Sequence, residues 1–179
     1  MEYGLNIDLD IILVNIQQAG LTDEGGDMSA KVRLGHVGVV VKNPKHSVEF
    51  YRDLLGLEVT MEGSFSTLGD FAFLSERPGE KFVTLALATN PPAAHVAMEV
   101  ESLGALKAVH ADALARGVPI VMALNHVVTV SLYVLDPDGN AVEVYWLTGR
   151  KVDQPYGVPL DLQKSESELL ELIDQPAAV

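Results

Sequence analysis

Cysteine is missing from all 179 residues of the chain. Its absence excludes a disulfide framework, a thiol nucleophile and a cysteine-ligated zinc site. Long apolar runs are missing as well, since no stretch approaches the roughly 20 residues of a membrane-spanning helix. The amino terminus has no basic region before its apolar stretch, which argues against a secretory signal. We therefore expect a cytoplasmic protein with no membrane partner.

Basic residues are scarce. The chain has 12 lysines and arginines against 25 aspartates and glutamates, which gives a formal charge of −13. A surface of this sign repels nucleic acid, so we expect no nucleic-acid partner. The length suits one well-packed domain, and the hydrophobic content of 48% is that of an ordinary soluble protein.

The pattern of apolar and turn-forming residues divides the chain into three parts. Residues 1–30 are interpreted as an N-terminal extension, in which an apolar stretch before a flexible linker is either a docked element or a tail. Residues 31–148 carry regular strands and helices. Residues 149–179 are interpreted as an extended strap and a short helix, whose start is marked by the capping-box pair Ser165 and Glu168.

The central part repeats one unit, with modules at about 32–90 and 93–148. Each module has the order strand-helix-strand-strand-strand, and Gly56 and Gly117 are expected to end the two helices. One such unit cannot bury both faces of its sheet alone, so the duplication predicts an α+β fold of two tandem βαβββ modules. The predicted strands are 32–41, 57–62, 70–75, 82–89, 94–100, 119–123, 127–135 and 141–147.

Three of these strands carry a residue that can bind a metal ion: His36, His95 and Glu143. Side chains alternate across a strand, so each of the three shares a face with small neighbours, while the opposite face is continuously apolar. Two imidazoles and one carboxylate are the donors of a facial metal site with open coordination positions. A lone strand histidine is more often structural, and a lone strand glutamate more often faces water. Recurrence at equivalent points of a duplicated unit favours the metal site.

Three stretches resemble a known family: GHVGV (35–39), SVEFYRDLLG (47–56) and DPDGNAVEV (136–144). They are similar to the vicinal oxygen chelate superfamily, which includes glyoxalase I, extradiol ring-cleaving dioxygenases and bleomycin-resistance proteins. The resemblance implies that the two modules form a cupped mixed sheet around a divalent metal, held here by His36, His95 and Glu143. It also implies a homodimer, because members of the superfamily commonly dimerise.

Within the family that the chain resembles, the fourth metal ligand distinguishes glyoxalase I-like members from extradiol dioxygenases. Glyoxalase I-like members carry a glutamate or glutamine on the fourth strand, where this chain has Thr84. Threonine is a poor ligand, and the remaining triad is that of the extradiol dioxygenases, which hold Fe(II) or occasionally Mn(II). The resemblance therefore implies an Fe(II)-dependent dioxygenase that takes dioxygen and a catecholic or vicinal-diol small molecule.

Further site residues follow from the same resemblance. Tyr133 lies ten residues before Glu143, where extradiol enzymes place a tyrosine near the bound catecholate; packing in the core is the alternative. His126 is the candidate acid–base residue, because imidazole titrates in the required range. It lies seven residues before Tyr133, so a bulge or loop is needed to bring the two side chains together. The substrate pocket is expected to be shaped by Gly38, Thr84 and Ala97.

Two other functions fit the same sequence. A metal-dependent isomerase, epimerase or lyase would use Ni, Co, Zn or Mn as a Lewis acid and would need no oxygen. A non-catalytic small-molecule binding protein, as in bleomycin resistance, would bind no stoichiometric metal and would leave the three ligand-type residues unexplained.

Overall fold

Nine strands form one mixed sheet in the part of the chain that the computed structural model describes, residues 31–151 and 156–174. Their order is β2-β3-β4-β1-β5-β8-β7-β6-β9, which places the first strand of each module at the centre. The elements in chain order are β1 (Val32–Val40), α2 (Pro44–Leu55), β2 (Glu58–Phe65), β3 (Gly69–Ser75), β4 (Leu85–Ala88), the short 3-10 helix η1 (Pro91–Ala93), β5 (His95–Val100), α3 (Leu103–Arg116), β6 (Ile120–Asn125), β7 (Thr129–Leu135), β8 (Ala141–Leu147), β9 (Val158–Pro159) and α4 (Glu166–Asp174). The predicted α+β fold of two βαβββ modules is confirmed, whereas the predicted extension 1–30 lies outside the described residues.

Local sequence signals start and end α2 and α3. The side chain of Asn43 accepts hydrogen bonds from two backbone N–H groups in the first turn of α2, and Ser102 accepts one in α3. Gly56 and Gly117 end the helices with φ of 70° and 69°. Glycine is favoured at both positions because a Cβ is strained in this left-handed conformation.

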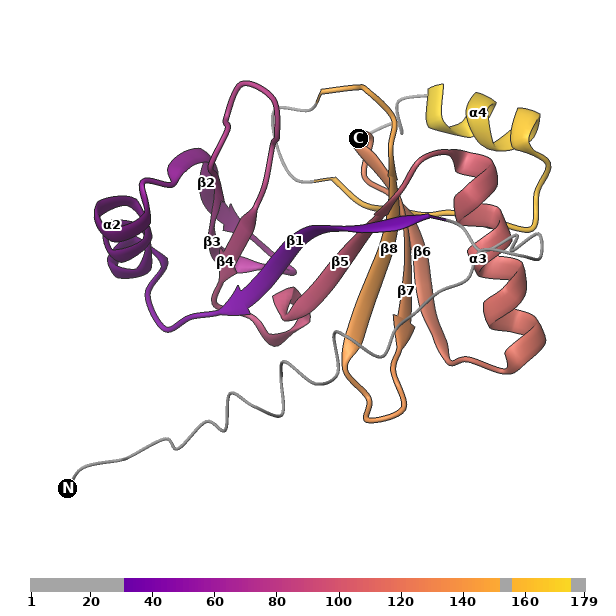
Figure 1. The fold of residues 1–179 in the computed structure, drawn as a ribbon, viewed down its shortest axis with the longest axis horizontal. Coiled ribbons are helices and arrows are strands. Elements are labelled where there is room, and N and C mark those ends of the chain that lie inside the picture. The colour runs from indigo at the N-terminus through magenta and orange to yellow at the C-terminus, as the bar shows by residue number, and fades with distance from the viewer. Residues whose placement is uncertain (1–30, 152–155, 175–179) are drawn as a thin grey trace, which may run out of the picture.

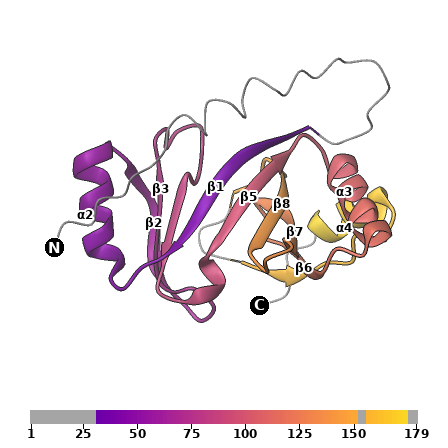
Figure 2. The same ribbon diagram turned by 60° about the horizontal axis from the view of Figure 1, so that its bottom comes forward.

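The helices cover one face of the sheet at its two ends (Figure 1). α2 packs over the first module, where Val48 meets Leu74. α3 and α4 lie side by side over the second module, and β1 and β5 cross the region between the two helical ends (Figure 2). The larger core beneath α3 and α4 includes Leu106, Leu132 and Leu169. Among the described residues, no helix has the length and apolar character required to cross a bilayer.

The C-terminal helix docks on its own chain. Ser165 and Glu168 form the predicted capping box, since the Glu168 carboxylate accepts from the Ser165 N–H at 2.9 Å and the Glu168 N–H donates to Ser165 Oγ at 3.3 Å. Leu169 and Ile173 are buried in the larger core. The helix therefore closes the outer face of the second module.

Two strand boundaries differ from the prediction by three residues, and the others by two or fewer. β2 continues through Gly63 to Phe65, because Gly63 stays paired with β3 and does not end the strand. β4 begins only at Leu85, and the carbonyl of Phe82 accepts a hydrogen bond from the Thr60 hydroxyl at 2.7 Å. At Phe82, a hydrogen bond from a side chain therefore takes the place of the backbone hydrogen bonds that join neighbouring strands.

An approximate twofold axis relates the modules and crosses the sheet between β1 and β5. These strands are antiparallel, and His36 pairs with Ala97 while Gly38 pairs with His95. Rotation about this axis therefore superimposes His36 on His95 and Gly38 on Ala97. Val39 packs beneath α2, so the histidines, on the alternate positions, project from the face that the helices leave uncovered.

Candidate metal centre

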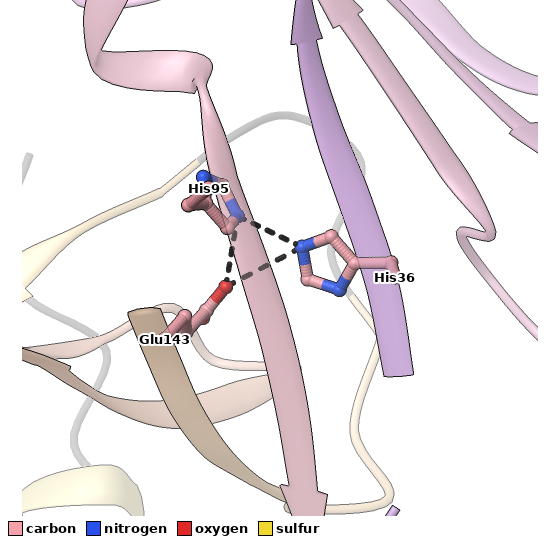
Figure 3. Close-up of side chains that lie close together, drawn as sticks. All are labelled: His36, His95 and Glu143. Atoms are coloured by element: carbon pink, nitrogen blue, oxygen red, sulfur yellow. Dashed lines mark hydrogen bonds and ion pairs between the residues drawn. The ribbon is translucent and has the colours of Figure 1, made fainter. Parts of the chain in front are cut away.

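Three neighbouring strands bring His36, His95 and Glu143 together on the uncovered face (Figure 3). Nε2 of His36 lies 3.1 Å from Nε2 of His95 and 3.3 Å from Oε2 of Glu143. Nε2 of His95 lies 3.1 Å from the same oxygen. The three donor atoms therefore form a nearly equilateral triangle.

The size of this triangle fits a divalent cation. Metal–ligand distances of about 2.1 Å give donor separations of about 3.0 Å at right angles and about 3.4 Å at tetrahedral angles. The observed separations of 3.1 to 3.3 Å lie between these values. Two imidazoles and one carboxylate suit several first-row divalent metals, including iron, manganese and zinc. The residues thus form a possible metal-binding triad.

Glu143 is ionised although it is buried. Its exposed fraction is only 3%. Burial by itself would raise the pKa of this carboxyl, but hydrogen bonds and charge attraction from His36 and His95 outweigh burial and hold the pKa well below its usual value. The carboxylate is therefore in the form that a metal requires.

The outer nitrogens of both histidines are buried without a partner. Nδ1 of His36 and Nδ1 of His95 make no hydrogen bond among the described residues. A histidine that binds a cation through Nε2 carries its proton on Nδ1, where a carbonyl, carboxylate or water ordinarily accepts it.

Gly38 lies where two backbone segments nearly touch. A Cβ at this position would overlap the carbonyl oxygen of Ala93 and would lie 3.1 Å from Nδ1 of His95. Only glycine therefore fits between β1 and η1 without movement. Ala97, its counterpart in the second module, is fully buried. The expected contact of these two residues with a substrate stays a prediction.

The strand register defines where a fourth ligand would lie. Glu143 in β8 pairs with Ala97 in β5, and the twofold-related pair is Ala86 in β4 with Gly38 in β1. Ala86 is therefore the counterpart of Glu143. A methyl group stands where a carboxylate would complete a four-ligand site.

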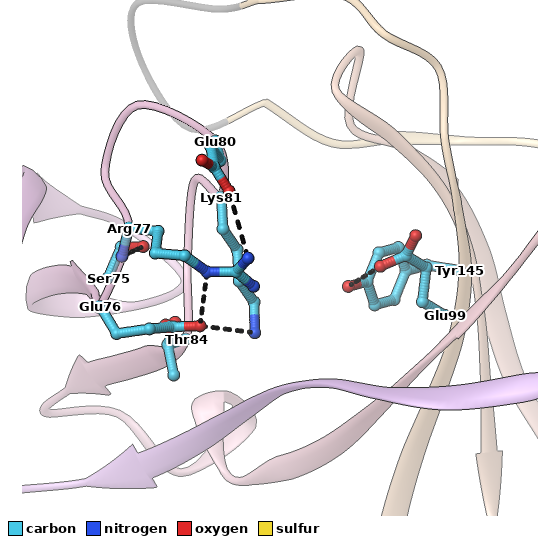
Figure 4. A network of polar contacts seen from close by, with 8 residues as sticks. All are labelled: Ser75, Glu76, Arg77, Glu80, Lys81, Thr84, Glu99 and Tyr145. Atoms are coloured by element: carbon cyan, nitrogen blue, oxygen red, sulfur yellow. Dashed lines mark hydrogen bonds and ion pairs between the residues drawn. The ribbon is translucent and has the colours of Figure 1, made fainter.

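Thr84 precedes this position by two residues, so the placement of Thr84 at the fourth-ligand position is wrong. The error arises because Thr84 and Ala86 share one face of the strand, and alternation alone does not separate them. The Thr84 hydroxyl donates to Glu76 (Figure 4), whose carboxylate lies 3.6 Å from Nε of Arg77 and 3.8 Å from Nζ of Lys81. Neither Thr84 nor Glu76 joins the three donor atoms.

Tyr133 lies beside the triad. It pairs with Glu143 across β7 and β8, and its ring centroid is 5.9 Å from that of His95. Burial raises the pKa of the Tyr133 phenol, and the neighbouring Glu143 carboxylate raises it further. The phenol therefore keeps its proton and is able to donate a hydrogen bond.

His126 reaches Tyr133 from the turn after β6. The strand ends at Asn125, Val127 then adopts a φ of 69°, and the Val128 N–H donates to the His126 carbonyl to close a γ-turn. This turn redirects the imidazole across the odd spacing, so that Nε2 lies 3.2 Å from the Tyr133 hydroxyl. The bulge or loop that the odd spacing of His126 and Tyr133 called for is therefore present.

A backbone carbonyl fixes the position of the proton on His126. Its Nδ1 contacts the carbonyl oxygen of Tyr156, in the strap that β9 holds against β6. A carbonyl oxygen only accepts, so Nδ1 carries the proton. In the neutral ring Nε2 is then the acceptor, and the Tyr133 hydroxyl donates to it. His126 is therefore able to take up a proton on the side that faces Tyr133.

Sequence reasoning missed a second polar group on the same face. Tyr145 packs against His36 with ring centroids 5.5 Å apart, and its hydroxyl donates to Glu99 at 3.4 Å (Figure 4). Glu99 in turn pairs with Arg33. The available signal was strand alternation, because Tyr145 and Glu99 follow the metal ligands of their own strands by even numbers of residues.

The model of the Glyoxalase/Bleomycin resistance protein/Dioxygenase superfamily matches residues 33–144, which is more than half of the chain. The chain therefore belongs to this superfamily. No match to the sequence is found among curated proteins.

Solved structures share the fold. A homoprotocatechuate 2,3-dioxygenase from Arthrobacter globiformis is 24% identical, with a TM-score of 0.57 over 79% of this chain and 41% of its own. A catechol 2,3-dioxygenase is 22% identical, with a TM-score of 0.57 over 72% of this chain and 46% of its own. A Mn(II)-bound glyoxalase from Novosphingobium aromaticivorans is 19% identical, with a TM-score of 0.51 over 65% and 40%. The chain spans less than half the length of these three proteins.

Proposed function

We propose that this chain is an Fe(II)-dependent dioxygenase of the extradiol type that acts on a catecholic or other vicinal-diol small molecule. The observation that carries the proposal is the triad of His36, His95 and Glu143 with the methyl group of Ala86 at the fourth-ligand position. A reaction between a chelating diol and dioxygen at one metal needs several open coordination positions. Three protein donors leave such positions, and a fourth would remove one.

The triad prepares the site for a cation and an anionic substrate. Iron bound there would supply Lewis acidity and a path for electron density from the diol to dioxygen. Glu143 is buried and ionised, so it offsets part of the cation's charge and leaves a net positive centre that attracts a diol anion. Tyr145 packs against the ring of His36 and limits its rotation.

Tyr133 and His126 handle the proton. The Tyr133 phenol keeps its own proton and donates it to Nε2 of His126, so its oxygen accepts a hydrogen bond from a substrate hydroxyl. His126 accepts through Nε2, so the proton that the diol loses on binding passes to the Tyr133 oxygen while the phenol proton passes to His126, and the same path returns a proton when the ring opens.

The test is oxygen consumption by protein loaded with Fe(II) under argon and then given oxygen and a panel of catechols. We expect oxygen uptake and a yellow ring-opened product, with a rate reduced about a hundredfold or more in His126→Gln. His46→Gln, which changes an exposed histidine of α2, is the matched control and should leave the rate unchanged. Iron-loaded protein that neither consumes oxygen nor yellows any catechol would overturn the proposal.

One observation supports a second candidate, a metal-dependent isomerase, epimerase or lyase. Glu76 accepts from Thr84, whose carbonyl in turn accepts from the N–H of Val37, next to His36. For this carboxylate to act as the fourth ligand, a change of side-chain conformation would have to bring it to the metal. This candidate predicts activity without oxygen that Glu76→Ala removes, whereas the dioxygenase needs oxygen and tolerates Glu76→Ala.

A further inference from the structure

The two halves of the uncovered face are equivalent in position and opposite in chemistry. The strand registers relate each polar residue of the second module to an apolar residue of the first. With the polar residue first, the pairs are Glu143 and Ala86, Tyr133 and Phe73, Tyr145 and Ala88, Ser131 and Phe71, and Glu99 and Val40. At these five positions the second module carries polar side chains and the first module carries hydrocarbon side chains.

Phe73 is the centre of the apolar half. Its ring centroid is 5.0 Å from that of Phe71 and 5.9 Å from that of Phe82. Phe71, two residues away on the same face of β3, is buried, whereas Phe82 keeps 36% of its surface exposed. Exposed apolar surface beside a polar centre is stabilised when a ligand covers it, and such surface is typical of a binding site.

This surface adjoins the side of the metal centre that lacks a fourth ligand. Ala86 is the neighbour of Gly38 on the adjacent strand, and Phe73 is the neighbour of Ala86 on the strand beyond. Strands lie about 4.8 Å apart, so Phe73 is about 10 Å from β1. That distance matches a ring held at the metal together with a substituent.

Basic side chains near this half are already paired with acidic ones. Two such pairs are Lys81 with Glu76 at 3.8 Å and Arg77 with Glu80 at 3.1 Å. A carboxylate on the substrate would have to compete with these partners and would lose its hydration. An uncharged substituent meets no such penalty.

We propose that Phe73 and Phe82 bind an uncharged aryl or alkyl substituent, so that the substrate is a hydrophobic vicinal diol. The inference rests on the proposed function for the diol that the metal holds, and it does not depend on the oxygen chemistry. Phe73 is a specificity-determining residue, since it touches the substituent and not the reacting atoms.

The test is calorimetric titration of zinc-loaded protein, in which diols bind without turnover. We expect 3-phenylcatechol and 4-butylcatechol to bind at least tenfold more tightly than catechol, and 3,4-dihydroxyphenylacetate to bind no more tightly than catechol. Phe73→Ala should weaken 3-phenylcatechol about tenfold and change catechol less than about threefold. Phe50→Ala removes a phenylalanine that is 56% exposed on α2, and it should leave every constant unchanged. Phe82→Ala provides a second variant if Phe73→Ala fails to fold.

The outcomes separate this inference from the dioxygenase proposal. Binding of the acidic diol as tightly as 3-phenylcatechol, a preference that survives both phenylalanine variants, or no binding of any diol would overturn the inference. Protein that prefers apolar diols but consumes no oxygen keeps the inference and loses the dioxygenase. Protein that consumes oxygen fastest with acidic diols keeps the dioxygenase proposal and loses the inference.

Discussion

The backbone of Gly35 lies directly against the hydroxyl of Tyr145, and a Cβ at Gly35 would overlap it. Tyr145 also packs on the ring of His36, with centroids 5.5 Å apart. A glycine one residue before the ligand thus admits the side chain that limits the ligand's movement. Displacement of Tyr145 would therefore displace His36.

We predict that Gly35→Ala weakens zinc binding about tenfold, which is the usual effect of disturbing a residue that orients a metal ligand. Calorimetric titration of metal-free protein with zinc measures the change. Gly79→Ala is the matched control, because nothing lies within 4 Å of a Cβ built there. Unchanged affinity in Gly35→Ala would show that Tyr145 does not orient His36.

Ala86 occupies the place in the first module that Glu143 occupies in the second. We predict that Ala86→Glu adds a fourth ligand, tightens zinc binding about tenfold and abolishes oxygen consumption, because a coordination position is lost. Ala86→Leu fills the same space without a donor atom and should not tighten zinc binding. A glutamate variant that binds zinc no better than the leucine variant would contradict the twofold relation.

The carbonyl of Tyr156 determines which nitrogen of His126 is protonated. We predict that neutral His126 carries its proton on Nδ1, and nitrogen-15 spectra of histidine-labelled, zinc-loaded protein distinguish the two forms. In Tyr133→Phe the Nε2 resonance should shift while the proton stays on Nδ1, since only the Nε2 partner is lost. A proton found on Nε2 would remove the acid–base role proposed for this residue.

Val127 combines a β-branched side chain with a φ of 69°. The Asn125 side chain accepts from its N–H at 2.8 Å, and the Thr148 hydroxyl donates to its carbonyl. The left-handed conformation disfavours residues with a Cβ by about 1–2 kcal/mol. Val127→Gly should therefore be about 1–2 kcal/mol more stable in urea titrations than Val128→Gly. Equal stabilities would show that the turn stores no strain.

The sequence predicted the features that depend on neighbouring residues. Asn43 and Gly56 marked the ends of α2 because capping is local chemistry, and both act as expected. Alternation along single strands placed each of the three candidate ligands on the face opposite its apolar neighbours. The duplication supplied the remaining information, since equivalent strands of two packed modules come together at the centre of the sheet.

Features that depend on pairing between strands were not predictable. Thr84 and Ala86 share a face, and only the pairing of β4 with β1 shows which of them matches Glu143. The γ-turn at Val127 has no local signal, because two valines in succession favour an extended strand. The approach of Tyr145 to Gly35 is likewise a contact between distant segments.

Binding of one divalent cation by His36, His95 and Glu143 is tested most directly by metal analysis of freshly purified protein. The wild type is compared with Glu143→Ala, and Glu49→Ala, at an exposed position of α2, is the matched control. We expect about one equivalent of iron or another divalent metal per chain in the wild type and in the control, and its loss in Glu143→Ala. Wild-type protein without stoichiometric metal, or a Glu143→Ala variant that retains it, would contradict the metal centre.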